Sequence, residues 1–350
     1  MISFRGSQLS ETRLPLGTVW LLEALAEAKG RRALYETQSP QILRALRELA
    51  LVESAESSNR IEGVTVKRDR LRPLVLGNAR PRDRSEEEIV GYRKALGWIH
   101  TTHEKIGVDP GTIKRVHALA QGGTTGDAGQ WKRAPNEIIQ VHPDGRREVR
   151  FRPVEPDKVP AAIEELCVAY RHSIDQLKVT PLLATACLVL DFLCIHPLRD
   201  GNGRVSRLLT LLALYRHGHA VGRYISLERI VEQTKESYYD ALGRSSAGWH
   251  EGRHDVLPWF NYFLSTLRMA YREFQERAGR ERPPRGSKAD LIAYALEHVP
   301  SPFGIADIER LCPNVSRGMI RIVMNRWRKQ SRLEILGRGR DARWRRVEGK

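Results

Sequence analysis

The sequence predicts a mainly α-helical protein that ends in a smaller module of mixed α and β structure. Apolar residues recur at helical spacing over most of the 350 residues, as at Leu43, Leu46 and Leu49. Runs that alternate apolar and polar residues, which are typical of strands, are rare. The stretch ERAGRERPPRGSK at 276–288 is charged and rich in proline and glycine, so we expect it to link the two parts, with a boundary near Arg282.

The composition is that of a folded protein without a membrane span. Apolar residues make up 41% of the chain and charged residues 29%. The apolar run PLLATACLVLDFLCI at 181–195 is shorter than the roughly 20 residues that a membrane helix needs. The N-terminus lacks a secretory signal pattern, and the four cysteines form no CxxC pair. These observations predict a cytoplasmic protein with reduced thiols.

Residues 1–89 are expected to form an N-terminal helical segment, and the stretch SSNRIEG at 57–63 has the character of a helix C-terminus. Gly63 suits the left-handed residue that often follows a helix. Glu62, in contrast, places a negative charge at the negative end of the helix dipole. Glu62 therefore needs a cation from elsewhere in the fold, unless it is an exposed surface residue.

The stretch NEIIQVHPDGRREVRFRP at 136–153 predicts a β-hairpin. Two short runs with β propensity flank the turn sequence HPDG at 142–145, in which glycine can take a positive φ.

Two buried helices are expected around the junction HPLRDGNGRVSR at 196–207. Pro181 suits a helix start, and Pro197 ends this first helix, so His196 lies at its end. The turn DGNG and the start of the next helix, with Arg204 and Arg207 on its first turn, form a site for phosphate. Asp200 is an acid among these cations, which suits a ligand of Mg²⁺. The alternative is a capped loop with surface arginines.

The C-terminal module is predicted to contain three helices, in 287–299, 304–312 and 316–331, and then two short strands within 333–347. This order resembles a winged helix. Residues 281–350 carry half of the net charge of +16. Ser316 is expected to cap the third helix, whose Arg317, Arg321, Arg326 and Arg328 would then face phosphate groups of DNA. A protein-docking module with a solvated basic face is the alternative.

The junction resembles the motif HxFx(D/E)GNGRxxR of Fic-domain proteins. Seven residues match it in type and spacing: His196, Asp200, Gly201, Asn202, Gly203, Arg204 and Arg207. Leu198 replaces the usual phenylalanine, and we expect it to pack inward without changing the chemistry. The resemblance implies a helical Fic core with a short hairpin flap, within a catalytic unit at 90–281 that is followed by the winged-helix-like unit at 282–350.

Most Fic proteins with the intact motif transfer AMP from ATP to a Ser, Thr or Tyr hydroxyl of a protein, so the resemblance implies an Mg²⁺-dependent protein adenylyltransferase. By motif position, His196 would deprotonate the hydroxyl and Asp200 would hold Mg²⁺. Asn202 and the turn amides would hold the α-phosphate, and Arg204 and Arg207 the outer phosphates. The implied nucleotide-binding residues are Gly201, Asn202, Gly203, Arg204, Val205, Ser206, Arg207, Tyr238 and Tyr239.

Two further stretches are similar to family features. Ser58, Glu62 and Gly63 match the inhibitory motif (S/T)xxxE(G/N), whose glutamate pairs with the second motif arginine, here Arg207. The hairpin stands where Fic proteins carry a flap that aligns the target segment, with Ile138 and Ile139 as its flap residues. The preceding GQWKR at 129–133 resembles the approach to that flap, with Trp131 as the aromatic residue and Arg133 nearby. A hairpin without function is the competing interpretation.

The predicted function is therefore autoinhibited adenylylation of a target protein, without a membrane partner. Removal of AMP from a modified protein at the same site is one alternative. A DNA-binding regulator, in which the basic C-terminal module is the working part, is another. Self-modification and a homodimer also stay open.

Overall fold

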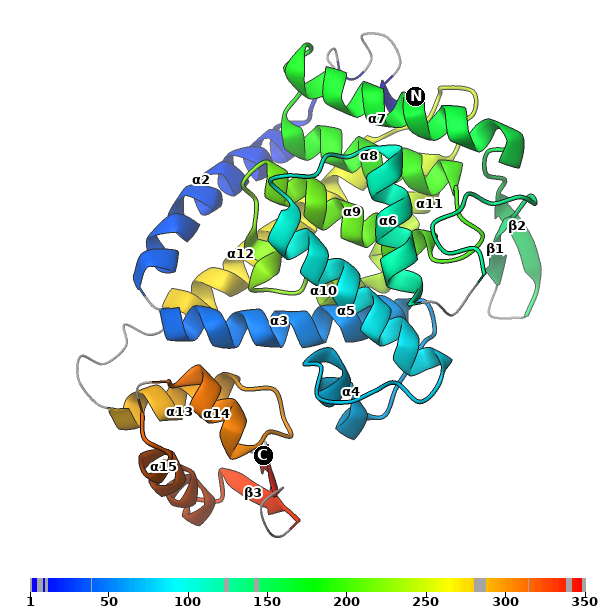
Figure 1. Cartoon of the computed structure of the whole chain (residues 1–350). Helices are drawn as coiled ribbons and strands as arrows, with labels where there is room; N and C mark the ends of the chain where they lie inside the picture. The colour runs from blue at the N-terminus through cyan, green and yellow to red at the C-terminus, as the bar shows by residue number, and fades with distance from the viewer. Residues whose placement is uncertain are drawn as a thin grey trace.

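The computed structural model describes residues 2–4, 9, 12–38, 40–122, 126–141, 145–279, 288–313, 315–337 and 342–347. The structure is mostly helical, as predicted (Figure 1). The longer helices of the first part are α2 (Leu16–Gln38), α3 (Pro40–Ile61), α4 (Arg68–Val75), α5 (Arg84–Thr102), α6 (Pro110–Gln121), α7 (Val159–Asp175), α8 (Pro181–Ile195), α9 (Asn202–Arg216), α10 (Leu227–Gln233), α11 (Lys235–Ser246) and α12 (Leu257–Gly279). Short 3₁₀ helices span Ile2–Phe4, Pro156–Lys158 and Val221–Arg223.

The centre of the first part is α8, whose side chains are buried on nearly all faces. It packs against α7, α9, α11 and α12, while α5 and α6 cover α9 on the side nearest the viewer in Figure 1. The predictions that Pro181 begins this helix and that the chain leaves it before Pro197 are confirmed. None of the helices in the described ranges combines the length and the apolarity needed to cross a membrane.

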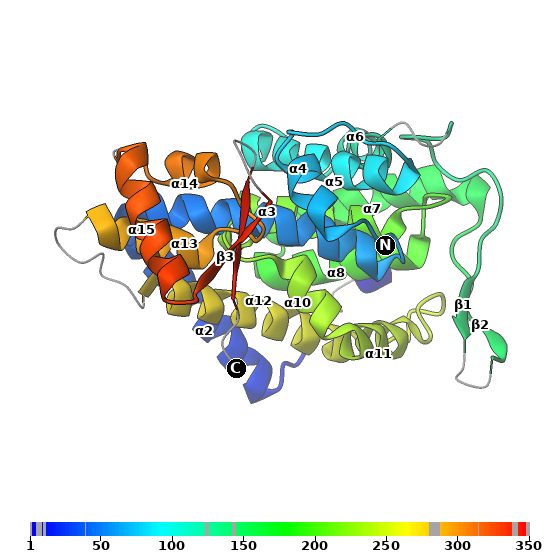
Figure 2. The same ribbon diagram turned by 90° about the horizontal axis from the view of Figure 1, so that it is seen from below.

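The predicted hairpin is present. Strand β1 (Ile138–Val141) pairs antiparallel with β2 (Arg147–Phe151), with a register shift between Ile138 and Ile139. It projects from one edge of the helical core in two perpendicular views (Figures 1 and 2). Of the predicted turn HPDG, residues 142–144 lie outside the described residues, and Gly145 has a φ of 81°.

The C-terminal module has the predicted order of elements. The helices are α13 (Lys288–His298), α14 (Ile305–Leu311) and α15 (Arg317–Lys329), and strands β3 (Leu333–Leu336) and β4 (Arg343–Arg346) form an antiparallel pair. Ser316 caps α15 as expected, because its hydroxyl accepts a hydrogen bond from the Met319 amide at 3.4 Å. The module has its own core, which includes Leu296, Phe303, Ile308, Ile320, Met324, Trp327 and Trp344. The division expected at 281/282 lies outside the described residues, and the one at 89/90 falls inside α5.

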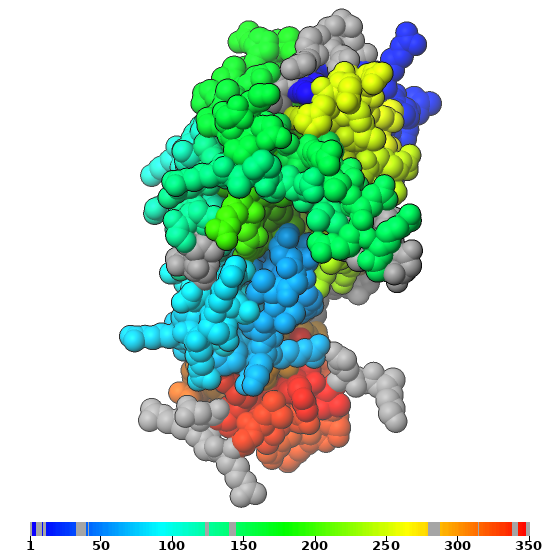
Figure 3. Space-filling view, turned by 90° about the vertical axis from the view of Figure 1, so that its right-hand side faces the viewer, coloured from blue at the N-terminus to red at the C-terminus, as the bar shows by residue number. Residues whose placement is uncertain are grey.

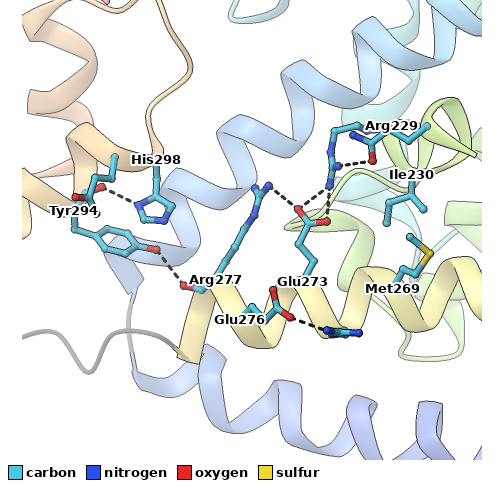
Figure 4. A pocket seen from close by; sticks show the side chains of 11 residues that line it. Arg229, Ile230, Met269, Glu273, Glu276, Arg277, Tyr294 and His298 are labelled. Atoms are coloured by element: carbon cyan, nitrogen blue, oxygen red, sulfur yellow. Dashed lines mark hydrogen bonds and ion pairs between the residues drawn. The ribbon is translucent and has the colours of Figure 1, made fainter. Parts of the chain in front are cut away.

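A cavity of about 660 Å³ lies at the junction between α10, α12 and α13. Figure 4 shows Glu273 of α12 between two arginines, with closest contacts of 2.5 Å to Arg229 and 2.5 Å to Arg277. Arg272 pairs with Glu276 at 3.1 Å. Because carboxylates compensate all three arginines, the cavity offers no unpaired guanidinium to an anionic ligand.

A buried arginine joins the module to the helical core. Arg72 of α4 forms ion pairs with Glu48 of α3 and with Asp307 of α14, and all three side chains are largely buried. Burial alone would raise the pKa of Asp307, but Arg72 and the Gly304 amide hold it below its usual value. The module therefore docks on α3, the helix that ends in the SSNRIEG stretch.

We expect Arg72→Ala to lower the free energy of unfolding by about 1.5–3 kcal/mol, because Asp307 and Glu48 lose a buried charged hydrogen-bond partner and keep only more exposed cations such as Arg310. Urea unfolding measures this loss. Arg44→Ala, at an exposed position of α3, is the matched control and should change the free energy by no more than about 0.5 kcal/mol. Equal effects of the two substitutions would show that the Arg72 pairs contribute nothing to docking.

Candidate active site

The loop between α8 and α9 holds His196 in an unusual backbone conformation. His196 has a φ of 51° and ends α8 by donating its backbone N–H to the Phe192 carbonyl at 2.9 Å. A left-handed conformation is uncommon for a residue other than glycine, so the surrounding loop must hold it in place. The Asn202 side chain helps to fix this loop, because it accepts a hydrogen bond from the Leu198 amide at 3.0 Å and donates one to the Leu198 carbonyl at 2.8 Å. Leu198 itself is fully buried, as expected.

The His196 imidazole is placed to act as a base. Its Nδ1 lies 3.2 Å from the Leu193 carbonyl oxygen. Since a carbonyl can only accept, Nδ1 carries the proton and Nε2 keeps its lone pair. Burial lowers the pKa of His196 to about 4, so the ring is neutral at pH 7. The ring lines a cavity of about 130 Å³ together with Glu62, Gly203, Arg207 and other side chains.

The lowered pKa of His196 predicts how the ring titrates and how stability depends on pH. In an NMR titration, the His196 ring should protonate near pH 4 in the folded protein, whereas an exposed histidine titrates at about 6.5. Because the unfolded chain binds this proton more readily, His196 removes stability as the pH falls below about 6.5 towards the folded pKa. The His196 ring signal is the one that disappears from the spectrum of His196→Asn. A midpoint near the ordinary value would contradict the burial of the ring.

The start of α9 is open to an anion. Gly201 takes a φ of 81° before the helix, and the unpaired amides of the first turn carry the positive end of the helix dipole. A Cβ atom on Gly203 would lie 2.1 Å from Glu62 Oε1, so a larger residue there would displace that carboxylate. A carboxylate of this chain thus stands against the helix end that suits a phosphate.

Glu62 and Ser58 hold Arg207. Arg207 Nη2 contacts Glu62 Oε1 at 2.8 Å and the Ser58 carbonyl at 2.9 Å, and Nε donates to Ser58 Oγ at 2.8 Å. Arg207 is buried, and its Nη1 has no hydrogen-bond partner in the described structure. Gly63 has a φ of 83°, which confirms the predicted left-handed residue after α3. The cation that the sequence required for Glu62 is therefore Arg207.

Arg204 lies elsewhere. Its buried guanidinium is 2.6 Å from Glu88 Oε2 of α5 and 3.3 Å from Asp200 Oδ2. It is not among the residues that line the cavity with His196. The structure thus brings Arg207, but not Arg204, to the cavity wall, and Glu88 is a partner that the sequence analysis did not identify.

Asp200 lies at the rim with a side chain that is 53% exposed. Its Oδ1 accepts from the Gly201 amide at 2.7 Å. No group of three or more His, Cys, Asp and Glu side chains in the described ranges is arranged to hold a metal. One exposed carboxylate suits Mg²⁺, which proteins commonly bind through one or two carboxylates, substrate phosphates and water.

The remaining predicted residues frame the cavity. Tyr238 and Tyr239 of α11 line it with ring centroids 5.2 Å apart, and Tyr238 is buried while Tyr239 is 39% exposed. Ile138 lines it from β1, whereas Ile139 is 40% exposed. Of the other motif residues, Val205 and Ser206 are buried within α9.

The approach to the hairpin differs from expectation. Arg133 is exposed and bonds only to Gln130 among the described residues, at 2.8 Å. Lys132 is buried instead, and burial lowers its pKa to about 8. Its amide donates to the Pro197 carbonyl at 2.8 Å and its Nζ to Asn136 Oδ1 at 2.7 Å, so Lys132 helps to hold the His196 loop.

Comparisons with known proteins find similar sequences and similar folds. A model of the Fic/DOC family matches residues 107–214. The Caenorhabditis elegans protein adenylyltransferase fic-1 is 24% identical over 184 residues, which cover 51% of this chain but only 32% of that protein.

Solved structures share the fold. A Fic family protein from Desulfovibrio desulfuricans superposes with a TM-score of 0.62 at 19% identity over 97% of this chain and 98% of its own. A Fic-domain-containing signaling protein from Bacteroides thetaiotaomicron has a TM-score of 0.62 at 20% identity over 74% of this chain and 98% of its own. C. elegans Fic-1 superposes with a TM-score of 0.57 at 20% identity over 76% of this chain and 75% of its own. Residues 107–214 therefore match the Fic/DOC family, and the chain has the fold of solved Fic proteins.

Proposed function

We propose that this Fic-domain protein transfers AMP from ATP to a hydroxyl side chain of a target protein, and that Glu62 restrains it. The observation that carries the proposal is the single cavity lined by a neutral His196, the N-terminus of α9 and an arginine that Glu62 occupies. The match to a family that includes a named adenylyltransferase supports the reaction class.

The proposed reaction uses His196 as general base. The target hydroxyl oxygen bonds to the α-phosphorus of ATP, and its proton passes to the free Nε2 of His196. The bond from the α-phosphorus to the bridging oxygen of the β-phosphate breaks, and pyrophosphate leaves. The α9 amides would stabilise the charge on the α-phosphate, and Asp200 would hold Mg²⁺ against the phosphates, where the ion offsets their charge.

Glu62 would restrain the enzyme by occupying Arg207. A productive ATP places its outer phosphate where Arg207 can bind it, and a carboxylate at 2.8 Å both competes for the guanidinium and repels that phosphate. The buried Nη1 without a partner is the additional donor that a phosphate oxygen would satisfy. Tyr238 and Tyr239 would contact the adenine.

Two forms of labelled ATP test the reaction class. With Mg²⁺, ATP labelled at the α-phosphorus should label protein, whereas ATP labelled at the γ-phosphorus should not. Label from the γ-position would show phosphoryl transfer and contradict the proposal.

AMP removal is a second candidate, because Glu62 lines the same cavity as His196 and could orient a water there. Self-labelled protein separates the two. If the unaltered chain releases AMP from a labelled Glu62→Gly chain and never gains label itself, removal is its main reaction.

Arg207→Ala, made together with Glu62→Gly, should weaken ATP binding by about 10- to 150-fold, the range of one hydrogen bond to a charged group. AMP binding should change little, because AMP lacks the outer phosphates. Calorimetric titration with each nucleotide measures both constants. An equal loss for the two nucleotides would place Arg207 away from the outer phosphates.

A further inference from the structure

The outer face of α15 carries cations and no acid. Four side chains of this helix, Ile320, Val323, Met324 and Trp327, are buried in the module core. The exposed positions are Arg317, Gly318, Arg321, Ile322, Asn325, Arg326, Arg328 and Lys329. In Figure 1, α13 and α14 lie between α15 and α3, and Figure 2, seen from below, shows α15 uncovered. The module forms one end of the molecule (Figure 3), so this face is open to a partner.

Most of these cations lack a counter-charge. Arg317 pairs with Glu309 at 3.4 Å. Arg321, Arg326, Arg328 and Lys329 form no ion pair within the described ranges. Like charges four residues apart on a helix destabilise it, and Arg317 and Arg321 form such a pair. The contrast with the compensated arginines at the α12 junction indicates an anionic partner for this face.

The cations occupy both flanks of the exposed face. At 3.6 residues per turn, Arg321 and Arg328 fall on one flank and Arg326 on the other, while Lys329 lies near the middle of the face. Asn325 and Gly318 lie beside Lys329, between the two flanks. A helix is about 10–12 Å across, and the major groove of B-DNA is about 12 Å wide with phosphates along both edges. Cations on both flanks of the helix match these two phosphate edges.

The middle of the face suits contact with bases. A Cβ atom on Gly318 would meet nothing within 4 Å, so packing inside the protein does not require glycine there. Glycine nevertheless destabilises a helix relative to alanine, by about 1 kcal/mol in a helix interior and by less in the first turn, where Gly318 lies. A missing side chain at this position lets the helix backbone approach an external surface closely. Asn325 can pair with adenine, and Ile322, which is 57% exposed, can contact a thymine methyl.

We infer that α15 lies in the major groove of double-stranded DNA and that this module anchors the protein to it. Double-stranded RNA fits less well, because its major groove is too deep and narrow for side chains to read. Single strands bind through exposed aromatic side chains, whereas Trp327 and Trp344 are buried. A membrane surface requires a broad apolar face, and α15 exposes a single large apolar residue, Ile322.

Fluorescence anisotropy of a labelled random-sequence DNA duplex tests the inference with the full chain. Four phosphate contacts predict a slope of about −3.6 in log K against log [KCl], or about a 150-fold loss of affinity between about 50 and 200 mM salt. Arg321→Ala with Arg328→Ala should reduce the slope to about −1.8 and the loss to about 12-fold. The control pair, Arg115→Ala with Arg171→Ala, removes the same charge from exposed positions of α6 and α7 and should leave the slope unchanged.

Three results would overturn the inference. One is no binding of the duplex at the lower salt concentration. Another is the same loss of slope in both double variants, which would reflect net charge alone. The third is displacement of the duplex by polyglutamate at equal charge, because the partner of this face would then be an acidic polypeptide.

Discussion

Glu62→Gly should raise self-labelling with AMP by about 10- to 150-fold over the unaltered chain. The contact from Glu62 Oε1 to Arg207 Nη2 is a charged hydrogen bond of 2.8 Å, and such bonds contribute about 1.5–3 kcal/mol. Removal of the carboxylate frees the guanidinium and clears the space above Gly203. Label from α-labelled ATP, followed over time at equal protein concentration, measures the increase.

Two further variants define the cause. Glu62→Gln keeps the shape of the side chain and removes its charge, so it should give an intermediate rate. Glu56→Gly makes the same change six residues earlier, within α3, and should not raise the rate, since Glu56 pairs with Arg60 and not with Arg207. An unchanged rate in Glu62→Gly would remove Glu62 from regulation.

His196→Ala should lower AMP transfer by about 10²- to 10⁴-fold in the Glu62→Gly chain, the usual contribution of a general base. The ring supplies Nε2, and no other residue is proposed to accept the hydroxyl proton. Nucleotide affinity should hold, because the phosphates are assigned to the α9 amides and Arg207. The initial rate of labelling and a calorimetric titration with ATP measure these two quantities.

The backbone at His196 calls for a second variant. Histidine tolerates the left-handed conformation better than alanine does, so a small loss of stability is expected besides the loss of activity. Asparagine tolerates this conformation better, so His196→Asn should keep the stability and still lose the transfer. Full activity in either variant would rule out His196 as the base.

Much of the cavity could be predicted because the information lies in one short stretch. The apolar run before Pro197, the turn glycines and the helix start fix the positions of His196 and of the α9 N-terminus through local rules alone. Glu62 places a negative charge at the negative end of a helix dipole, so the sequence shows that it needs a cation. The family resemblance implied that this cation is Arg207. Arg207 is 145 residues away in sequence, and the structure shows the pair.

The partners of the other charged residues could not be predicted in this way. Arg204 looks like Arg207 in sequence, yet Glu88, 116 residues away, holds its guanidinium. Arg72 carries no motif, and its contact with Asp307 spans 235 residues. Lys132 is buried and Arg133 is exposed. The two cations are neighbours in a loop, where no periodicity shows which of them is buried. Long-range pairing and burial therefore account for what the sequence analysis missed.

The central claim is that one cavity holds both the base and its restraint. The most direct measurement is transfer of α-labelled AMP, with Mg²⁺, to the unaltered chain, to Glu62→Gly and to Glu62→Gly with His196→Ala. We predict weak labelling of the unaltered chain, strong labelling of Glu62→Gly and no labelling of the double variant. Equal labelling of all three chains, or strong labelling that survives the loss of His196, would contradict it.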